Sequence, residues 1–304
     1  MNLDWIPFGF LPLYKPVGPT SHDMVARVRA LLNRQVKVGH TGTLDPFASG
    51  VLVVAVGKAT RFSDYVQKLP KAYRAVLTLG VQTDTLDPSG QVEREAEVPE
   101  IDPETLETVR RQFTGKLLQV PPVFSAKRVM GRRSYQLARR RQPVVLEPSE
   151  VTVYALELEL AGPGQIRCEV RCSRGTYIRA LGRDIAQALG TCGHISELVR
   201  TEVGPVSLSQ CLRPERLSLE TLRDHQLPVS HVLPQFPELQ LPFEAFEPLV
   251  QGRAFPVEEP YPLAFLGTVK APDGEIVGVF RCAYEPQSGA IAPKLQCFAN
   301  QTTT

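Results

Sequence analysis

The sequence has no Cys-x-x-Cys pair, no long apolar run and almost no excess of charge of either sign. A formal net charge of +2 over 304 residues does not by itself point to a nucleic-acid partner. No apolar run approaches the ~20 residues that a membrane helix needs. The N-terminal segment MNLDWIPFGF has no basic region ahead of an apolar stretch. We therefore expect a cytoplasmic protein without a membrane segment or a secretory signal.

The six cysteines lack the spacing of a disulfide framework or of a zinc site. In a chain of this length without a secretory signal, reduced thiols are expected. Cys192 and His194 could supply half of a metal site, but no second ligand pair follows at finger-like spacing. We therefore expect no metal.

What the sequence does contain is typical of a globular protein with one large domain or two unequal ones. Hydrophobic residues make up 43% and charged residues 22% of the chain, a composition that allows a sizeable core and argues against disorder. Apolar periodicity and turn residues predict the main elements. Strands are predicted at 10–14, 51–56, 73–80, 151–160 and 165–172, helices at 21–33, 102–115 and 178–189, a loop at 38–50 and a turn at 82–90.

The composition changes after about residue 226, where proline becomes frequent. This density of proline opposes long helices and suggests a connecting stretch. Beyond it, the segments 263–269, 276–283 and 294–298 are typical of short strands separated by turns. A small β-rich C-terminal domain is therefore expected, and we place its boundary between residues 235 and 236.

A cluster of basic residues without an acid among them stands out within the segment 120–145. Its members are Lys127, Arg128, Arg132, Arg133, Arg139, Arg140 and Arg141. A solvated helix face is the simplest interpretation, but such faces usually alternate in sign. Arginine side chains match phosphate oxygens, and several of them together give strong, salt-sensitive binding. The cluster predicts an arm that contacts phosphates.

The loop at 38–50 combines glycines with polar side chains, among them Asp45. Pro46 restricts Asp45 to extended conformations and so helps to aim its carboxylate. A capping or turn aspartate is the ordinary interpretation of an isolated Leu-Asp-Pro. The loop is not of the Walker type, because Gly-Lys-Ser/Thr is absent.

Five segments resemble, in order and spacing, the bacterial tRNA pseudouridine synthase B (TruB) family. They are KPVGPTSHDMV, GHTGTLDPFASGVLVVAVGKATR, KAYRAVLTLGVQTDTLDPSG, PPVFSAKRVMGRRSYQLAR and CSRGTYIRALGRDI. The resemblance implies an α+β fold, in which residues 1–235 form a pseudouridine-synthase-type catalytic domain with a mixed, largely antiparallel sheet and a basic arm. Residues 236–304 resemble, more loosely, the family's small PUA-type RNA-binding domain.

This resemblance implies the isomerisation of uridine 55 in the T-loop of tRNA to pseudouridine. The N1–C1′ bond breaks, the base rotates, and C5 bonds to C1′. No redox step occurs and no group is exchanged with solvent, so no cofactor and no metal are implied. The implied partner is the T stem-loop of tRNA; no protein partner is implied, and a monomer is expected.

The resemblance also assigns the catalytic residues. Asp45 matches the catalytic aspartate, and two roles remain open to it: attack on C1′, as in covalent glycosidase intermediates, or removal of a proton from C2′ to give a glycal. Arg179 matches the arginine that pairs with this aspartate, and an adjacent cation favours the ionised carboxylate. Tyr73 matches the tyrosine that stacks on the extracted uracil. The residues alone leave an alternative open for each: Arg179 as a surface helix residue, which is as well supported as the catalytic role, and Tyr73 as a strand tyrosine with its ring in the core.

Three further residues are implied in substrate binding. His40 matches a histidine at the RNA-facing edge of the loop, and Tyr177 and Leu198 match residues that line the uracil pocket. For Leu198, a plain core position is a serious alternative. Lys15 and Pro16 resemble scaffold that holds the loop of Asp45.

Two other classes of function remain as alternatives. One is an RNA-binding or RNA-folding protein with minor or lost activity, against which the joint presence of Asp45, Tyr73 and Arg179 argues. The other is a glycoside-processing enzyme with paired carboxylates. Asp84 and Asp87 could form such a pair, but turn chemistry explains them better.

Overall fold

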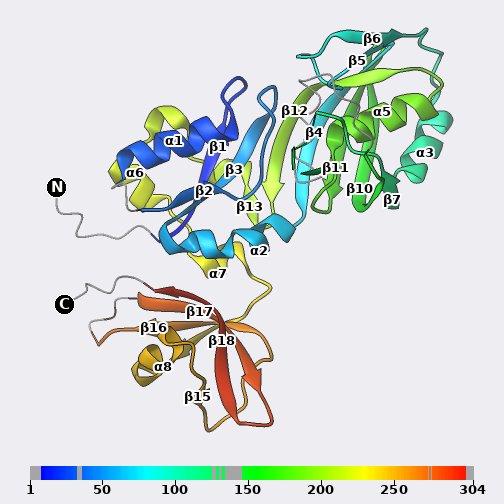
Figure 1. Cartoon of the computed structure of the whole chain (residues 1–304). Coiled ribbons are helices and arrows are strands. Elements are labelled where there is room, and N and C mark those ends of the chain that lie inside the picture. Colours follow the sequence, from blue (N-terminus) through cyan, green and yellow to red (C-terminus); the bar gives the residue numbers. More distant parts are fainter. Residues whose placement is uncertain are drawn as a thin grey trace.

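The computed structural model describes residues 8–32, 36–124, 128–129, 132–133, 146–272, 274 and 276–298. Two units are visible in Figure 1: a large sheet with helices, and a smaller, curled sheet near the C-terminus. Among the described residues, no helix combines the length and the apolar character that crossing a membrane requires.

The large sheet is mixed and largely antiparallel. Along its main path the strands are β1 (Gly9–Lys15), β3 (Ser49–Val56), β12 (Gly193–Val203), β4 (Lys71–Leu79), β11 (Gln165–Cys172), β10 (Ser149–Gly162) and β7 (Gly115–Gln119). Only β3 and β12 pair in parallel along this path. Two short strands join its side, β2 (Val38–His40) on β3 and β13 (Val206–Ser207) on β12. The expected α+β class is confirmed.

Helices pack against this sheet, and their ends follow local capping chemistry. Helix α1 (Ser21–Leu31) begins with a capping box, in which the Thr20 side chain accepts from the Asp23 backbone N–H and the Asp23 carboxylate accepts in return. Helix α3 (Pro103–Gln112) is capped by Asp102. It ends before Gly115, which the sequence pattern placed at the helix stop but which instead begins β7 with a φ of +102°.

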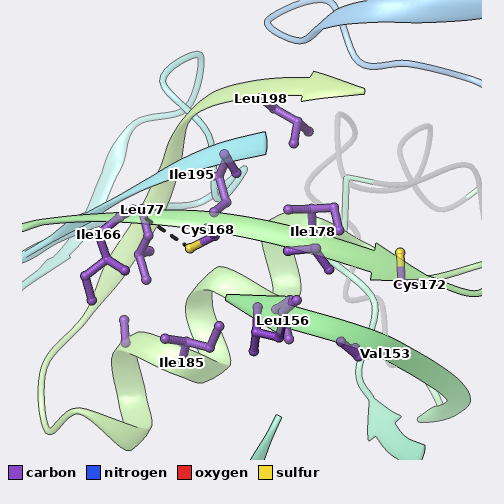
Figure 2. Packing of buried hydrophobic residues seen from close by; sticks show 14 of the residues in the cluster. Leu77, Val153, Leu156, Ile166, Cys168, Cys172, Ile178, Ile185, Ile195 and Leu198 are labelled. Carbon is purple, nitrogen blue, oxygen red and sulfur yellow. Dashed lines mark hydrogen bonds between the residues drawn. The ribbon is translucent and has the colours of Figure 1, made fainter. Parts of the chain in front are cut away.

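The main core lies between the sheet and helix α5 (Ile178–Ala188). Side chains of α5, such as Ile178 and Ile185, meet Leu77 of β4, Ile166 of β11 and Leu156 of β10 (Figure 2). The predicted helical spacing produces this buried face. Because the core fixes α5 against the sheet, it also fixes whatever side chains stand at the start of the helix.

The remaining elements of the large unit are short. They are the 3₁₀ helices Gly57–Phe62, Leu208–Gln210 and Pro214–Arg216, the helices α2 (Ser63–Lys68), α6 (Leu219–Asp224) and α7 (Val229–Val232), and the strand pairs β5 (Val81–Thr83) with β6 (Val92–Glu95) and β8 (Arg128–Val129) with β9 (Arg132–Arg133).

The C-terminal unit is a five-stranded sheet. Its order is β14 (Glu238–Leu241), β16 (Phe265–Lys270), β17 (Ile276–Glu285), β18 (Ala290–Phe298) and β15 (Phe255–Pro256), with a 3₁₀ helix (Phe243–Ala245) and α8 (Phe246–Val250) alongside. Leu266 and Val279 of this sheet share a buried cluster with Phe10 and Phe62 of the large unit. The three C-terminal strands expected from the sequence are present, and β14, β15 and α8 were not predicted.

Candidate active site

A cavity of about 880 Å³ opens where the segment between β2 and β3 meets β4, β12 and the start of α5. The segment is shorter than the predicted loop 38–50, because β2 and β3 occupy both of its ends and leave residues 41–48. The side chains around the cavity include six charged ones, drawn from five separate stretches of the chain: Asp45, Lys71, Asp87, Arg174, Arg179 and Arg200.

The loop that carries Asp45 is held on both sides by buried polar groups. The ammonium of Lys15, which is fully buried, donates to the carbonyl oxygens of Pro46 at 3.4 Å and Ala48 at 2.7 Å. The Ser21 hydroxyl donates to the Leu44 carbonyl and accepts from the Leu44 N–H. The scaffold role that the resemblance implied for Lys15 therefore has a structural counterpart in these bonds.

Asp45 forms an ion pair with Arg179, with 2.9 Å between Oδ2 and Nη2. The Arg179 side chain is 6% exposed and that of Asp45 is 35% exposed. The guanidinium is therefore inside the wall of the cavity, whereas the carboxylate still faces it. Arg179 also donates to the carbonyl oxygens of Thr85 at 2.7 Å and Phe124 at 3.0 Å. These bonds leave the arginine little freedom to move, and they hold its charge beside Asp45.

Asp87 is the second carboxylate on Arg179, at 3.2 Å from Nη1, and its side chain is also 6% exposed. Sequence reasoning assigned it to turn chemistry. That is correct for Oδ1, which accepts from the Thr85 hydroxyl and from the Ser89 N–H and hydroxyl. Sequence reasoning missed the contact between Asp87 Oδ2 and Arg179, because only the tertiary fold brings these two residues together. Asp84 keeps to the turn and accepts from the Gln91 N–H.

The residues implied in uracil binding meet at the same cavity. Tyr73 lies on β4, Tyr177 precedes α5, and Leu198 lies on β12; all three line the cavity. The ring of Tyr73 also packs against the main core, and Leu198 is 6% exposed and belongs to that core (Figure 2). Both residues therefore serve the core and the cavity wall at once. Burial raises the pKa of the Tyr73 hydroxyl, which keeps it protonated.

Among the described residues, His40 does not line the cavity. His40 lies on β2, with its ring 6.5 Å from that of His22. Of the arm, the described backbone includes Arg128, Arg132 and Arg133, which lie on the paired strands β8 and β9 rather than on a helix. The other basic residues of the arm lie outside the described residues: Lys127, Arg139, Arg140 and Arg141.

Arg200 is a site residue that sequence reasoning missed. It is 3% exposed, lies on β12 and lines the cavity. Its guanidinium donates to carbonyl oxygens of the Asp45 loop and of β3. The only sign in the sequence is an arginine two positions after Leu198, which by itself is typical of a surface strand.

Two lysines near the cavity, Lys15 and Lys71, are buried, and burial disfavours the charged form of each. Burial lowers the pKa of Lys15 to about 8, although the nearby charge of Asp45 opposes the shift. Burial also lowers the pKa of Lys71 to about 8. The ammonium of Lys71 donates to the carbonyl oxygens of Gln67, in the last turn of α2, and of Leu69, just after that helix. In the folded protein each of these ammonium groups is therefore about half deprotonated near pH 8.

The contribution of each of these two lysines to the free energy of unfolding should therefore rise as the pH increases from about 8 toward 10.5, the ordinary pKa of lysine. In this range the unfolded chain binds protons that the folded chain has released, so each such lysine adds up to about 1.4 kcal/mol per pH unit. Lys71→Met removes one of these contributions. Urea unfolding from pH 7 to pH 10 should show the difference between wild type and variant growing in favour of wild type above pH 8. A difference that stays constant with pH would contradict the assignment to Lys71.

Family models match most of the large unit. The model described as TruB family pseudouridylate synthase, N-terminal domain, matches residues 29–178, and that of the tRNA pseudouridylate synthase B C-terminal domain matches residues 179–235. Together they cover the Asp45 loop, β4, α5 and β12, on which the cavity is built.

Individual relatives agree with the family models. A protein of Aquifex aeolicus named tRNA pseudouridine synthase B is 38% identical over 291 residues, which cover 94% of this chain and 98% of the relative. One of the same name from Caldanaerobacter subterraneus is 41% identical over 248 residues, covering 81% and 85%. Among solved structures, an H/ACA ribonucleoprotein bound to a substrate RNA containing 2′-deoxyuridine matches with a TM-score of 0.67 at 23% identity, covering 99% of this chain and 92% of that one. At that identity the match supports the fold alone.

Proposed function

The chain belongs to the TruB family of pseudouridylate synthases, and we propose that it isomerises uridine 55 in the T-loop of tRNA to pseudouridine. The observation that carries this proposal is the Asp45–Arg179 ion pair of 2.9 Å in the wall of a cavity that Tyr73 also lines. A carboxylate, a cation beside it and an aromatic platform are the groups that this isomerisation requires.

In the proposed reaction, Asp45 acts on the ribose of the extracted nucleotide. Its oxygen either attacks C1′ as the N1–C1′ bond breaks or takes the proton from C2′, and in both cases the base leaves with the bonding electrons. The base then rotates and C5 bonds to C1′, while the Asp45 oxygen leaves C1′ in the first route or returns the proton to C2′ in the second. C5 finally gives up its proton and N1 takes one up. Deuterium at C2′ separates the two routes, because only the second breaks that C–H bond. The side chain that faces the cavity in either route is Asp45, and Arg179 stays behind it.

The cavity fits the freed base. Tyr73 supplies an aromatic face, and stacking on such a face contributes roughly 1–3 kcal/mol per base. Leu198 and Tyr177 supply further wall. Extraction of a nucleotide resembles base flipping, which costs a few kcal/mol and less in a strained loop than in a duplex. We propose that recognition of the T-loop therefore rests on its partly unstacked shape.

We propose that the arm, more than the C-terminal unit, neutralises the RNA phosphates. Residues 236–304 contain four lysines and arginines against eight aspartates and glutamates, a net charge of −4. The arm carries the seven basic residues from Lys127 to Arg141 without an acid among them. Salt-sensitive affinity follows the number of neutralised phosphates. Any RNA binding by the acidic C-terminal unit must therefore depend on shape or on individual contacts.

One assay tests the proposed function. Wild type and Asp45→Asn are incubated with an unmodified tRNA transcript, and pseudouridine is mapped by position. We expect wild type to convert uridine 55, and the variant, which keeps the size of the side chain but removes its charge, to form no product while still binding tRNA. Asp84→Asn, in the same turn as Asp87 but without a contact to Arg179, is the matched control and should stay active. Absence of product from wild type, or full product from Asp45→Asn, would remove the proposal.

A further inference from the structure

Arg200 lies where β12 runs between β3, the strand that follows the Asp45 loop, and β4, the strand that carries Tyr73. On one side β12 pairs in parallel with β3, and Arg200 lies opposite Gly50. On the other side β12 pairs with β4, and Arg200 lies opposite Tyr73. The register shifts directly after this position, between Arg200 and Glu202. The backbone of Arg200 therefore connects the strand next to the Asp45 loop with the strand that carries Tyr73.

The contact with Gly50 is unusually close. A Cβ at Gly50 would lie 2.2 Å from the Arg200 carbonyl oxygen, and the φ of Gly50 is +112°. A side chain at this position would force β3 away from β12, and glycine alone adopts such a backbone conformation readily. The end of the Asp45 loop is thus pressed against the Arg200 backbone.

The side chain of Arg200 holds the same loop from within. Its Nη2 donates to the Gly42 carbonyl at 3.1 Å, its Nη1 to the Thr43 carbonyl at 3.1 Å, and its Nε to the Val51 carbonyl at 2.8 Å. These acceptors lie on both sides of Asp45, so one rigid, planar group spans the base of the loop. A lysine ammonium could not present the same fork, because its donors radiate from a single point.

The guanidinium also acts on Tyr73, because its positive charge opposes the rise that burial causes in the pKa of the hydroxyl. Arg200 therefore lies near both the Asp45 loop and Tyr73. It is not the ion-pair partner of the site carboxylates, because Asp45 and Asp87 pair with Arg179.

We propose that Arg200 is a positioning residue of the isomerase site, which sets the placement of the Asp45 carboxylate relative to the Tyr73 ring. This inference rests on the proposed function. The arginine acts through other groups: it holds the loop carbonyls, the loop aims Asp45, and β12 keeps Tyr73 at a fixed register. A displacement of about 1 Å in such an arrangement can cost on the order of a hundredfold in rate.

The test compares Arg200→Lys with wild type in single-turnover reactions on a tRNA transcript at saturating enzyme, together with tRNA affinity and melting temperature. The charge is kept and the fork is lost. We expect the rate constant to fall by about a hundredfold, with tRNA affinity within threefold of wild type. Arg171→Lys is the matched control, because Arg171 is an exposed arginine of the neighbouring strand β11, and its substitution should change neither rate nor affinity.

A double variant separates positioning from mere support of the fold. If Arg200 aligns Asp45 with Tyr73, then Arg200→Lys combined with Tyr73→Phe should lose less than the product of the two single losses, because displacing a hydroxyl that is already absent costs nothing further. A rate within threefold of wild type, a loss of affinity equal to the loss of rate, or strictly multiplicative losses would each overturn the proposal. If Arg200→Lys does not fold, Arg200→Gln replaces it; failure of both to fold would also overturn the proposal. Absence of product from wild type in the same assay would instead reject the proposed function.

Discussion

Arg179→Met should lower the rate of pseudouridine formation by about 10²–10³-fold while tRNA affinity changes little. The substitution keeps the volume of the side chain but leaves Asp87 buried without its cation and Asp45 without a partner on its inner side. Removal of one partner from a buried ion pair costs about 3–5 kcal/mol. In this variant the unpaired charge lies in the site itself, where the reaction needs a fixed carboxylate, so we expect part of this cost to raise the activation barrier. Each 1.4 kcal/mol on that barrier corresponds to about tenfold in rate.

Single-turnover rates and tRNA binding, measured with the same preparations, check this expectation. Arg183→Met is the matched control, because Arg183 lies one turn further along α5 and pairs with Asp184 instead of with the site carboxylates. Asp87→Asn should lower the rate by less than Arg179→Met does, since Arg179 keeps its bonds to Asp45 and to two carbonyl oxygens. An Arg179→Met variant as fast as wild type would mean that the ion pair has no part in the chemistry.

Tyr73→Phe should bind tRNA as wild type does and turn over about 10²–10⁴-fold more slowly, the range that proton transfer by a positioned side chain contributes. The substitution keeps the ring that packs against the core and faces the cavity, and it removes only the hydroxyl. Because burial raises the pKa of that hydroxyl, it is protonated at neutral pH and is suited to pass the C5 proton on through a hydrogen bond.

Tyr154→Phe provides the control for this second experiment. Tyr154 lies on β10 and is 55% exposed, so its hydroxyl should be dispensable. Equal rates for Tyr73→Phe and wild type would restrict Tyr73 to stacking. Loss of tRNA binding in Tyr73→Phe would show that the hydroxyl supports the fold or the RNA contact instead of the chemistry.

Much of the fold could be predicted from local patterns. The helix at 21–33 and its cap, the strand pair at 151–160 and 165–172, and the helix ending at Gly190 all follow from residue periodicity and capping chemistry, and the structure contains each of them within a few residues. These elements are short-range: their hydrogen bonds and apolar faces join neighbours in the sequence.

Strand β12 escaped prediction for a physical reason. Register shifts between Ile195 and Glu197 and again between Arg200 and Glu202 break the two-residue alternation by which a strand is recognised. The buried positions along it are therefore spaced unevenly. The same irregularities turn Leu198 toward both the core and the cavity, and they place Arg200 under the Asp45 loop.

The sequence by itself determined the family resemblance, the α+β class and the identity of Asp45, Tyr73 and Arg179 as candidates, because these depend on residue types in order and on local periodicity. Only the tertiary structure decided that Asp87 shares Arg179 with Asp45, and that Arg200 binds the Thr43 carbonyl from 157 positions away. Contacts over such distances arise from how strands pair and how a helix packs on them. Packing is a property of the assembled sheet, and no local pattern of residues encodes it.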